Sequence, residues 1–169
     1  MVTANSSLQI RPYVSADCAL IADAHVRFYQ DVLGWSEAFC QYSTSIPYSY
    51  DAAPKNPRSE IWVAELDGKF AGCIMLKENP EDPTSGQLRI FMVEPWARKQ
   101  GVGSALLETF MAKAKADGYQ KLFLETCEQL TAARRAYSRL GFVCTKTWTN
   151  GNWREDGELV TEEYWEMSL

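Results

Sequence analysis

The sequence lacks any excess of basic residues. Its 169 residues include 17 Lys and Arg against 22 Asp and Glu, which gives a formal net charge of −5. Proteins that coat nucleic acid or an anionic membrane need a basic surface, so we expect neither partner here. The sequence also lacks the run of about 20 apolar residues that a membrane-spanning helix needs. Its longest stretch without Asp, Glu, Lys or Arg is 38–50, which has 13 residues and is rich in Ser and Tyr.

Histidine is nearly absent, and the cysteines show no pairing pattern. His25 is the single histidine, which excludes a His-rich metal site and leaves one residue for any His-dependent catalysis. The five cysteines, at positions 18, 40, 73, 127 and 144, are odd in number and form no CxxC. We therefore expect no metal and reduced, mostly buried thiols in a cytoplasmic protein. The stretch 1–10 has neither the basic region nor the long apolar region of a secretory signal.

The rest of the composition is that of a globular protein. Hydrophobic residues make up 46% and charged residues 23% of the chain. At about 100–200 residues per domain, we expect 1–169 to be a single domain. Hydrophobic periodicity predicts strands at 8–13, 60–66, 69–77, 87–93, 121–125, 142–148 and 164–169, and helices at 19–33, 36–44, 103–116 and 131–140. A hairpin before a strand–helix–strand crossover predicts a mixed sheet with helices on both faces.

Turn and cap residues divide these elements. Ser15 and Ser36 are expected to cap the first two helices, and Asp67-Gly68 is expected to form a two-residue hairpin turn. The proline-containing segments 47–58 and 78–86 are expected to be loops.

The stretch 93–104 carries the strongest chemical signal. A strand ends there, a short loop follows, and a helix begins at Gly101 and Gly103. The first N–H groups of a helix lack partners and lie at the positive end of its dipole, while glycines let a ligand approach the backbone. Together with Arg98, they predict an anion site, most naturally for a pyrophosphate. The alternative is a helix start whose glycines serve only tight packing.

Two other phosphate-binding motifs do not fit this stretch. The P-loop pattern GxxxxGK[ST] is absent. The dinucleotide fingerprint GxGxxG is half met, because Leu106 stands at its third glycine, and Glu125 lies near the position of a ribose-binding acid. Seven residues nevertheless separate Val93 from Gly101, whereas the fingerprint needs its first glycine directly after the strand. We therefore reject a nicotinamide cofactor.

These residues resemble those of the GNAT N-acetyltransferases. Arg98-Lys99-Gln100-Gly101-Val102-Gly103 matches the [Q/R]xxGx[G/A] motif of that family, with Val93-x-Pro95 before it and Tyr137-x-x-x-Gly141-Phe142 after it. The resemblance implies an α/β (α+β) fold with a mixed, mostly antiparallel twisted sheet and helices on both faces. A closer resemblance is to GNAT domains fused to MarR-type regulators. It rests on His25-x-x-x-Tyr29, Gly34-Trp35, Trp62-x-Ala64-Glu65-x-Asp67-Gly68, Gln87-Leu88-Arg89, Leu124-x-Thr126, Ala132-Ala133-Arg134 and Tyr164-Trp165-Glu166. The DNA-binding part of those regulators has no counterpart in this sequence.

The resemblance implies a binding site for acetyl-CoA. The pyrophosphate would lie on the backbone N–H groups of Arg98, Lys99, Gln100, Gly101, Val102, Gly103 and Ser104. The pantetheine arm would pair like a strand along Phe91, Met92 and Val93, where neighbouring strands separate. Thr131 and Arg134 are weaker candidates for contacts to the CoA chain.

Tyr137 matches the tyrosine that, in many members of the family, hydrogen-bonds the CoA sulfur. Its role would be to protonate or stabilise the leaving thiolate. The alternative is a packing residue on the helix 131–140.

No catalytic base can be transferred from the family. Some members use a glutamate near the position of Gln87, and glutamine cannot accept a proton. Glu125 could serve through a water molecule, or could be an ion-paired or solvated residue at a strand end. His25 could be the base or a hydrogen-bonded structural histidine.

The acceptor pocket is expected to contain His25, Tyr29, Trp35 and Glu125. Of these, His25 and Tyr29 share one helix face. The segment 148–153 and the acids that follow, Glu155, Asp156 and Glu158, could recognise a cationic amine or form a solvated loop.

The expected function is transfer of acetyl from acetyl-CoA to a primary amine by direct attack, without a metal. A small-molecule acceptor is favoured, and a protein N-terminus or lysine is the alternative. A non-catalytic acyl-CoA-binding module is the rival from another class. A monomer or homodimer is expected.

Overall fold

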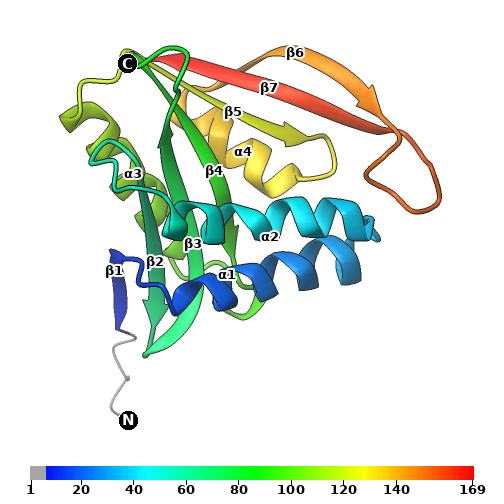
Figure 1. The fold of residues 1–169 in the computed structure, drawn as a ribbon, viewed down its shortest axis with the longest axis horizontal. Coiled ribbons are helices and arrows are strands. Elements are labelled where there is room, and N and C mark those ends of the chain that lie inside the picture. Colours follow the sequence, from blue (N-terminus) through cyan, green and yellow to red (C-terminus); the bar gives the residue numbers. More distant parts are fainter. Residues whose placement is uncertain (1–6) are drawn as a thin grey trace.

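The computed structural model describes residues 7–169, and the first six residues of the stretch 1–10 lie outside it. These residues form a seven-stranded sheet in the order β1-β2-β3-β4-β5-β7-β6 (Figure 1). The strands are β1 (Leu8–Pro12), β2 (Glu60–Leu66), β3 (Lys69–Glu78), β4 (Ser85–Val93), β5 (Lys121–Cys127), β6 (Val143–Asn150) and β7 (Val160–Ser168). Among the described strands, β4 and β5 form the one parallel pair. The expected mixed, mostly antiparallel sheet is confirmed.

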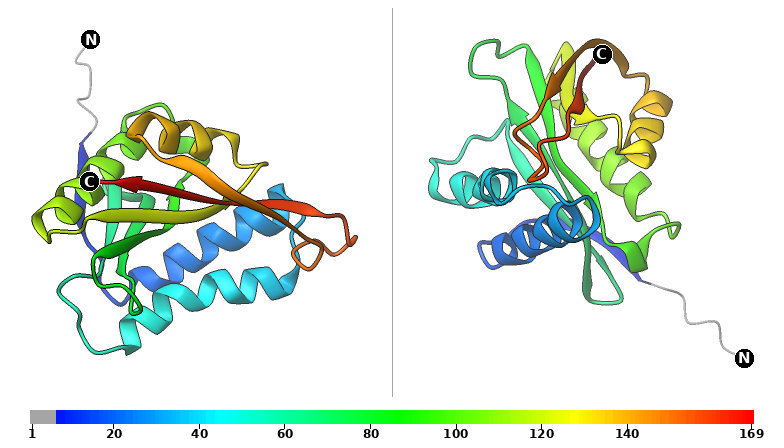
Figure 2. Two further views of the ribbon diagram at one scale, coloured as in Figure 1. Left: turned by 90° about the horizontal axis from the view of Figure 1, so that it is seen from above. Right: turned by 90° about the vertical axis from the view of Figure 1, so that its right-hand side faces the viewer.

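Helices cover both faces of the sheet, as the sequence predicts (Figure 2). One face carries α1 (Asp17–Val26), the π-helical segment η1 (Arg27–Val32) and α2 (Glu37–Ala52). The other face carries α3 (Val102–Ala116) and α4 (Thr131–Leu140), and the 3-10 turn η2 (Pro95–Ala97) follows β4. None of the helices in the described part of the chain is long and apolar enough to cross a membrane.

Two apolar clusters join the helices to the sheet. Leu106 and Phe110 of α3 are fully buried against Leu122 and Leu124 of β5. On the opposite face, Ile21 of α1 is buried against a cluster formed by Ile61, Val63, Cys73 and Met75 of β2 and β3. Burying each large aliphatic side chain contributes about 1.5–3 kcal/mol, so both helical layers are firmly attached.

The Asp67-Gly68 hairpin is confirmed. Both residues have positive φ, 52° and 75°, which the tight turn between β2 and β3 requires.

The first helix differs from the prediction in its cap and its end. The N-cap of α1 is Ala16, and it makes no side-chain cap bond. The Ser15 hydroxyl instead donates to Asp51, while the backbone N–H of Val14 donates to Asp17 Oδ2. The α-helix ends at Val26, and the π-helical segment η1 follows over 27–32, with Leu33, the end of the expected range 19–33, as its C-cap. Periodicity alone does not distinguish these two helix types.

The second helix is longer than predicted. Ser36 caps α2 as expected, because its hydroxyl accepts from the N–H of Phe39 at 3.3 Å. The helix then continues through the buried Pro47 to Ala52, so 47–52 is not a loop. Ile46 and Tyr50 explain the extension, because they pack against the apolar cluster around Ile21 of α1. This burial outweighs the tendency of proline to break a helix.

Two strands near the C-terminus also differ from their predicted ranges. β6 ends at Asn150, and β7 begins at Val160 where the sequence had predicted 164. Their pairing continues from Val143↔Glu166 to Asn150↔Val160, so two polar strands support each other as a long hairpin. All five cysteines are unpaired, and each is buried except Cys144, which is half-buried.

Candidate active site

The strands β4 and β5 begin as neighbours and then separate. Their parallel pairing covers three positions, Ser85↔Lys121, Gly86↔Leu122 and Gln87↔Phe123. Beyond Gln87 the two ribbons diverge (Figure 1). The backbone of β4 therefore presents unpaired N–H and C=O groups toward the opening, which is what an extended ligand needs in order to add to a sheet edge.

A β-bulge in β4 bends the strand at this point. Met75 faces Arg89, whereas Cys73 faces Met92, so β4 has one more residue than β3 across this interval. Ile90 takes a left-handed conformation with φ of 46°, and its carbonyl accepts from the Cys73 thiol at 3.1 Å. Burial raises the pKa of Cys73, which keeps the thiol protonated as a donor.

The loop after β4 leads into α3 through a strained turn. Lys99 has φ of 60°, and Gly101, the N-cap of α3, has φ of 85°. No side chain caps this helix, so its first N–H groups remain available to a ligand. Only glycine adopts the Gly101 conformation at low cost, which accounts for one of the two motif glycines.

The second glycine of the motif places this loop beside β4. A Cβ at Gly103 would lie 3.5 Å from Val93 Cγ2 and 3.6 Å from Phe91 Cζ, which are ordinary contacts. Tight packing therefore does not require glycine at 103. Phe91 and Val93 nevertheless lie next to the start of α3, so the open strand edge and the free helix amides are adjacent.

Polar side chains of the loop lie on its outer surface. Arg98, Lys99 and Gln100 are exposed. Arg98 donates to the carbonyl of Val93 at 3.2 Å, and Gln100 donates to the carbonyl of Trp96 at 2.9 Å. The loop thus offers the cationic and neutral donors that suit a phosphate group.

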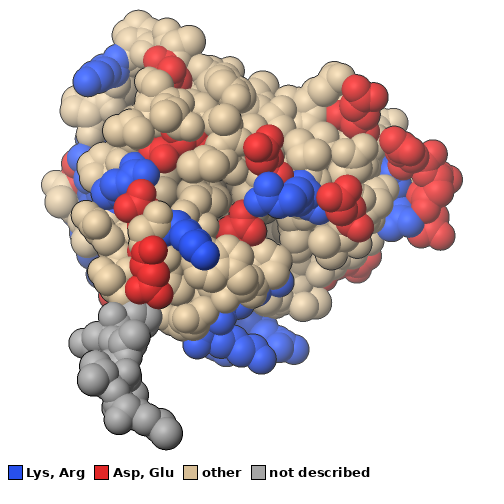
Figure 3. All heavy atoms as spheres, turned by 90° about the horizontal axis from the view of Figure 1, so that it is seen from below, with Lys and Arg blue, Asp and Glu red and all other residues tan. Residues whose placement is uncertain are grey.

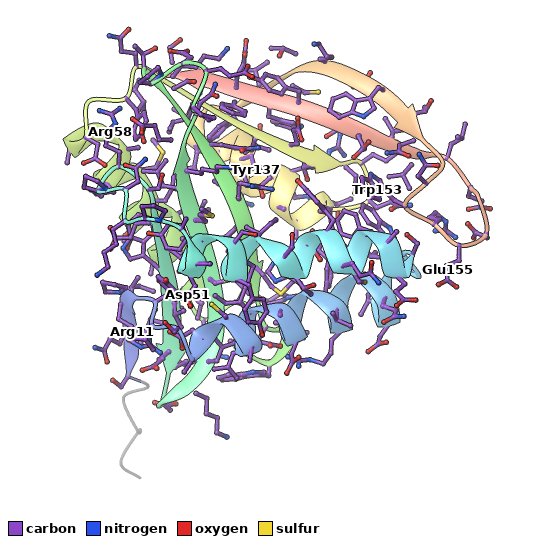
Figure 4. The ribbon with its side chains drawn as sticks, in the orientation of Figure 1. Arg11, Asp51, Arg58, Tyr137, Trp153 and Glu155 are labelled. Carbon is purple, nitrogen blue, oxygen red and sulfur yellow. The ribbon has the colours of Figure 1, made fainter. Side chains whose placement is uncertain are left out.

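Tyr137 of α4 lies between β4 and β5 (Figure 4). Its ring is 5% exposed and contacts Phe91, Phe142 and Trp165 at centroid distances of 6.1, 6.1 and 6.5 Å. Burial raises the pKa of Tyr137 far above its usual range, so the hydroxyl is protonated at neutral pH. Packing contacts hold the ring, and the hydroxyl retains a proton to donate.

The other two predicted contacts to the CoA chain, Thr131 and Arg134, both lie on α4 and differ in their surroundings. Thr131 is exposed at the start of the helix. Arg134 is engaged, because its Nε donates to Glu163 Oε2 at 2.9 Å. Glu163 is 4% exposed and also accepts from the indole of Trp165 at 2.8 Å. The Arg134 guanidinium is therefore held against β7.

On the α2 side of the opening, a cavity of about 290 Å³ brings together the residues predicted for acceptor binding. They are His25, Tyr29, Trp35 and Glu125, and Gln87 lines the same cavity. Five aromatic residues line it in all: Tyr29, Trp35, Phe39, Tyr42 and Trp153. This volume is near the lower end of ligand-binding pockets, and it suits a small ligand or a single side chain.

The connection between β6 and β7 closes one end of this cavity. Trp153 extends from that connection toward α2 (Figure 4), and its ring lies 4.9 Å from that of Phe39. The backbone N–H of Ser36 donates to the carbonyl of Trp153 at 2.6 Å, and Trp35 forms a β-bridge with Arg154. The C-terminal hairpin and the start of α2 are thus joined around the cavity.

His25 is a buried, neutral histidine. Its Nδ1 donates to the carbonyl of Ile21 at 2.7 Å, and the side chain stacks on Tyr29. Burial lowers the pKa of His25 to about 4. This geometry fits the hydrogen-bonded structural alternative, and a group with so low a pKa is a weak base at neutral pH.

Glu162 of β7 was missed by the sequence interpretation. Its two carboxylate oxygens accept from Trp148 Nε1 at 2.6 Å, Trp153 Nε1 at 2.7 Å and Asn150 Nδ2 at 3.1 Å, and it lines the cavity. The sequence drew attention to 148–153 for its aromatics and acids. The signal that could have found Glu162 is a longer hairpin, in which Glu162 pairs with Trp148 and lies beside it on the same face of the sheet.

No metal centre is evident within residues 7–169, because no group of three or more His, Cys, Asp and Glu side chains is arranged to hold an ion.

Comparison with known proteins identifies the family. The sequence model of the acetyltransferase (GNAT) family matches residues 20–142, which is more than half of the chain. The chain belongs to the GNAT family. The family is one of acetyltransferases.

Relatives and solved structures agree with this assignment. The N-acetylaspartate synthetase of Xenopus tropicalis is 34% identical over 88 residues, which are 52% of this chain and 32% of that protein. The chain spans about a third to a half of the length of the curated relatives it matches.

Two solved structures share the GNAT fold. The N-acetyltransferase of Staphylococcus aureus Mu50 superimposes with a TM-score of 0.80 at 19% identity, covering 96% of this chain and 99% of that one. The protein yncA of Salmonella typhimurium, solved with its cofactor acetyl-CoA, gives a TM-score of 0.76 at 18% identity, with 97% and 95% covered.

Proposed function

We propose that this GNAT protein transfers the acetyl group of acetyl-CoA to the primary amine of a small molecule. The observation that carries the proposal is the open edge of β4 beside the uncapped N-terminus of α3. These two sets of free backbone groups suit the two polar parts of an acyl-CoA, the amide-containing arm and the pyrophosphate. Few other small molecules combine an extended amide chain with a pyrophosphate.

The residues that would hold the donor lie on both elements. Phe91, Met92 and Val93 offer the strand edge. The loop offers the N–H groups of Arg98, Lys99, Gln100, Gly101, Val102, Gly103 and Ser104, and Thr131 and Arg134 are weaker candidates on α4. Bound acetyl-CoA supplies the activated thioester, and a backbone N–H near Val93 is suited to polarise its carbonyl.

Tyr137 is the proposed proton donor to the departing thiolate. Its ring packs against Phe91 and Phe142, and burial raises the pKa of the hydroxyl, which is therefore protonated at neutral pH. A general acid in this position contributes typically 10²–10⁴-fold to rate.

The acceptor amine would enter from the cavity lined by His25, Tyr29, Trp35 and Glu125. It would attack the thioester directly, without a covalent acetyl-enzyme. Cys127 lines the cavity, but burial raises the pKa of its thiol to about 11, which makes it a poor nucleophile at neutral pH.

Calorimetric titration with acetyl-CoA, with NADH as the control, tests the donor site. Binding of acetyl-CoA alone, at micromolar strength or about −8 kcal/mol, is the expected result. A thiol-release assay with a panel of amines then tests transfer. Absence of acetyl-CoA binding would overturn the proposed site.

A non-catalytic acyl-CoA-binding module is the second candidate, and Gln87 in place of an acid favours it. Such a module would bind acetyl-CoA without any release of thiol by amines, and Tyr137→Phe would change nothing. A protein N-terminus or lysine remains the alternative acceptor, and peptides in the same panel test it.

Three further parts of the proposal rest on the sequence. They are a single domain over 1–169, a cytoplasmic monomer or homodimer without nucleic-acid or membrane partners, and a likeness to GNAT domains fused to MarR-type regulators. Size-exclusion chromatography with light scattering tests the oligomeric state.

A further inference from the structure

Glu162 carries a charge that the described residues do not neutralise. Its three partners, Trp148, Asn150 and Trp153, are neutral N–H donors. Within residues 7–169, no Lys, Arg or His forms an ion pair with it, whereas Glu163, the next residue, is paired with Arg134. A carboxylate that is fixed by three donors and turned toward a cavity is suited to bind a cation from outside the chain.

Glu162 lies on the wall of the cavity that β5 and β7 form. It lies directly across from Cys127 in the β5–β7 ladder, so the two side chains are on the same face about 5 Å apart. Cys127 lines the cavity as well. A cation held by Glu162 would therefore lie beside the end of β5, in the cavity proposed for the acceptor.

The charged side chains around the cavity are mostly negative. They are Arg89, Glu125 and Glu162, and His25 is neutral. The Arg89 guanidinium donates to the Tyr42 hydroxyl at 2.8 Å, on the border with a second cavity under α2 that Arg89 and Tyr42 also line. With two carboxylates against one guanidinium, the cavity attracts a cationic group.

Aromatic rings form much of the remaining wall. Phe39 packs edge to face on Tyr29 and Trp35 at centroid distances of 4.6 and 4.4 Å. Trp153 stacks near Tyr42 at 6.1 Å. Aromatic walls favour apolar rings and also attract cations through their faces. The cavity has room for one ring-sized group beside an ammonium.

We propose that Glu162 binds the ammonium of the acceptor and that the acceptor is a primary amine carried on a ring-sized apolar group. The ammonium releases one proton to solvent water before the neutral amine attacks the thioester. This inference rests on the proposed acetyl transfer, and it names the substrate class and the residue that selects it. Glu125 is the weaker partner, because it is exposed and no neighbouring donor fixes it. The indoles of Trp148 and Trp153 position the Glu162 carboxylate.

The test uses 2-phenylethylamine as the acceptor and compares Glu162→Gln with Glu128→Gln. Glutamine keeps the shape of the side chain and removes its charge. Acidic side chains gather at one end of the molecule (Figure 3), so the control must be an exposed acid that does not line the cavity, and Glu128 is one. We expect Glu162→Gln to raise the KM for the amine about 10- to 100-fold, the usual contribution of a charge-assisted hydrogen bond, with the KM for acetyl-CoA unchanged. Glu128→Gln should change neither constant.

A binding measurement keeps the test independent of turnover. Protein saturated with CoA is titrated with 2-phenylethylamine and with 2-phenylethanol, its uncharged counterpart. Wild type should bind the amine more tightly, and Glu162→Gln should lose that preference while its affinity for the alcohol is unchanged. Equal binding of amine and alcohol by wild type would overturn the role of Glu162.

A comparison of three amines tests the proposed class of acceptor. We expect kcat/KM for 2-phenylethylamine to exceed that for 1,4-diaminobutane and for a short peptide by at least about 10-fold, from burial of the ring. A preference for the diamine or the peptide would overturn the ring-sized acceptor. Acetyl-CoA binding without release by any amine would overturn the proposed transfer, and the calorimetric comparison would still decide the role of Glu162.

Folding of each variant is checked by its thermal melting curve. If Glu162→Gln does not fold, Trp148→Phe removes one of the three donors and keeps an aromatic side chain. We expect it to raise the KM for the amine about 3- to 10-fold, and an unchanged KM would overturn the proposal.

Discussion

On the α3 side of the opening between β4 and β5 the free groups belong to the backbone, whereas on the α2 side they belong to side chains. The α3 side has the unpaired edge of β4, the turn at Gly101 and the uncapped helix amides. The α2 side has five aromatic rings, Glu125 and the clamped Glu162. The proposed donor is always acetyl-CoA, so fixed backbone groups are sufficient to bind it. The proposed acceptor must be distinguished from many other amines, which requires specific side chains.

The comparison indicates where substitutions should act. On the α3 side, an added side chain should weaken acetyl-CoA binding because it fills the space that the ligand needs. On the α2 side, removal of a charged group should weaken binding of the amine. Tyr137 lies at the junction, because its ring packs against Phe91 of β4 and Trp165 of β7.

The largest expected effect is on the α3 side. Gly101→Asp should abolish acetyl-CoA binding, a loss of at least about 10³-fold, because it brings a negative charge and a Cβ to the phosphate site. Calorimetry measures the affinity. Gly118→Asp is the matched control, since Gly118 has φ of 75° and, like Gly101 at 85°, has no atom within 4 Å of an added Cβ. Equal losses in both variants would mean that strain alone is responsible.

At the junction of the two sides, Tyr137→Phe should lower kcat about 10²-fold with little change in acetyl-CoA affinity, because it removes a proton donor. Steady-state kinetics and calorimetry give the two values. Tyr119→Phe is the control, since Tyr119 is also buried and its hydroxyl donates to the carbonyl of Arg58. An unchanged kcat in Tyr137→Phe would show that Tyr137 only packs.

On the α2 side, His25 should make the free energy of unfolding depend on pH. Its pKa is about 4 in the folded protein and about 6.5 in the unfolded chain. The unfolded chain therefore binds more protons below pH 6.5, and stability falls as pH falls from 6.5 to 4. The loss between pH 7 and pH 5 is about 2 kcal/mol.

Urea unfolding of wild type and His25→Asn at pH 7 and pH 5 measures that loss. Asparagine retains a donor for the carbonyl of Ile21 and does not titrate. The variant should lose about 2 kcal/mol less than wild type between these pH values. Parallel losses would show that His25 is protonated in the folded state.

The smallest expected effect is at Glu163, on the opposite face of β7 from Glu162. Glu163→Gln weakens the pair with Arg134, whose side chain is 36% exposed, and should lower the free energy of unfolding by about 1 kcal/mol. Chemical denaturation measures it, with Glu108→Gln on the surface of α3 as the control. No change would mean that solvent replaces the lost partner of Arg134.

Most of the fold could be predicted from local signals. The order of strands and helices, the Asp67-Gly68 turn and the apolar face of α3 follow from periodicity and turn chemistry. The length of α2 could not be predicted in this way, because Pro47 is tolerated only through the burial of Ile46 and Tyr50 against distant strands. The π-helical turn after Val26 has no distinct sequence pattern.

The two sides of the opening also differ in whether local sequence predicts them. The loop 98–104 is contiguous in sequence, so a motif predicts it. The cavity draws on α1, α2, β4, β5 and the β6–β7 connection. Helix spacing sufficed to group His25 with Tyr29. Glu162 needed the pairing of β6 with β7, and the strand predicted at 164–169 begins after it.

The contact between the start of α2 and the β6–β7 connection has a consequence for the order of assembly. Ser36 bonds to Asn152, a residue 116 positions later in the chain. During synthesis the loop 98–104 and α3 emerge before this partner exists, and closing such a long loop is an entropically costly, late step. A nascent chain that has passed Ala116 therefore contains every residue of the proposed phosphate loop, while its cavity stays open until Trp153 reaches α2.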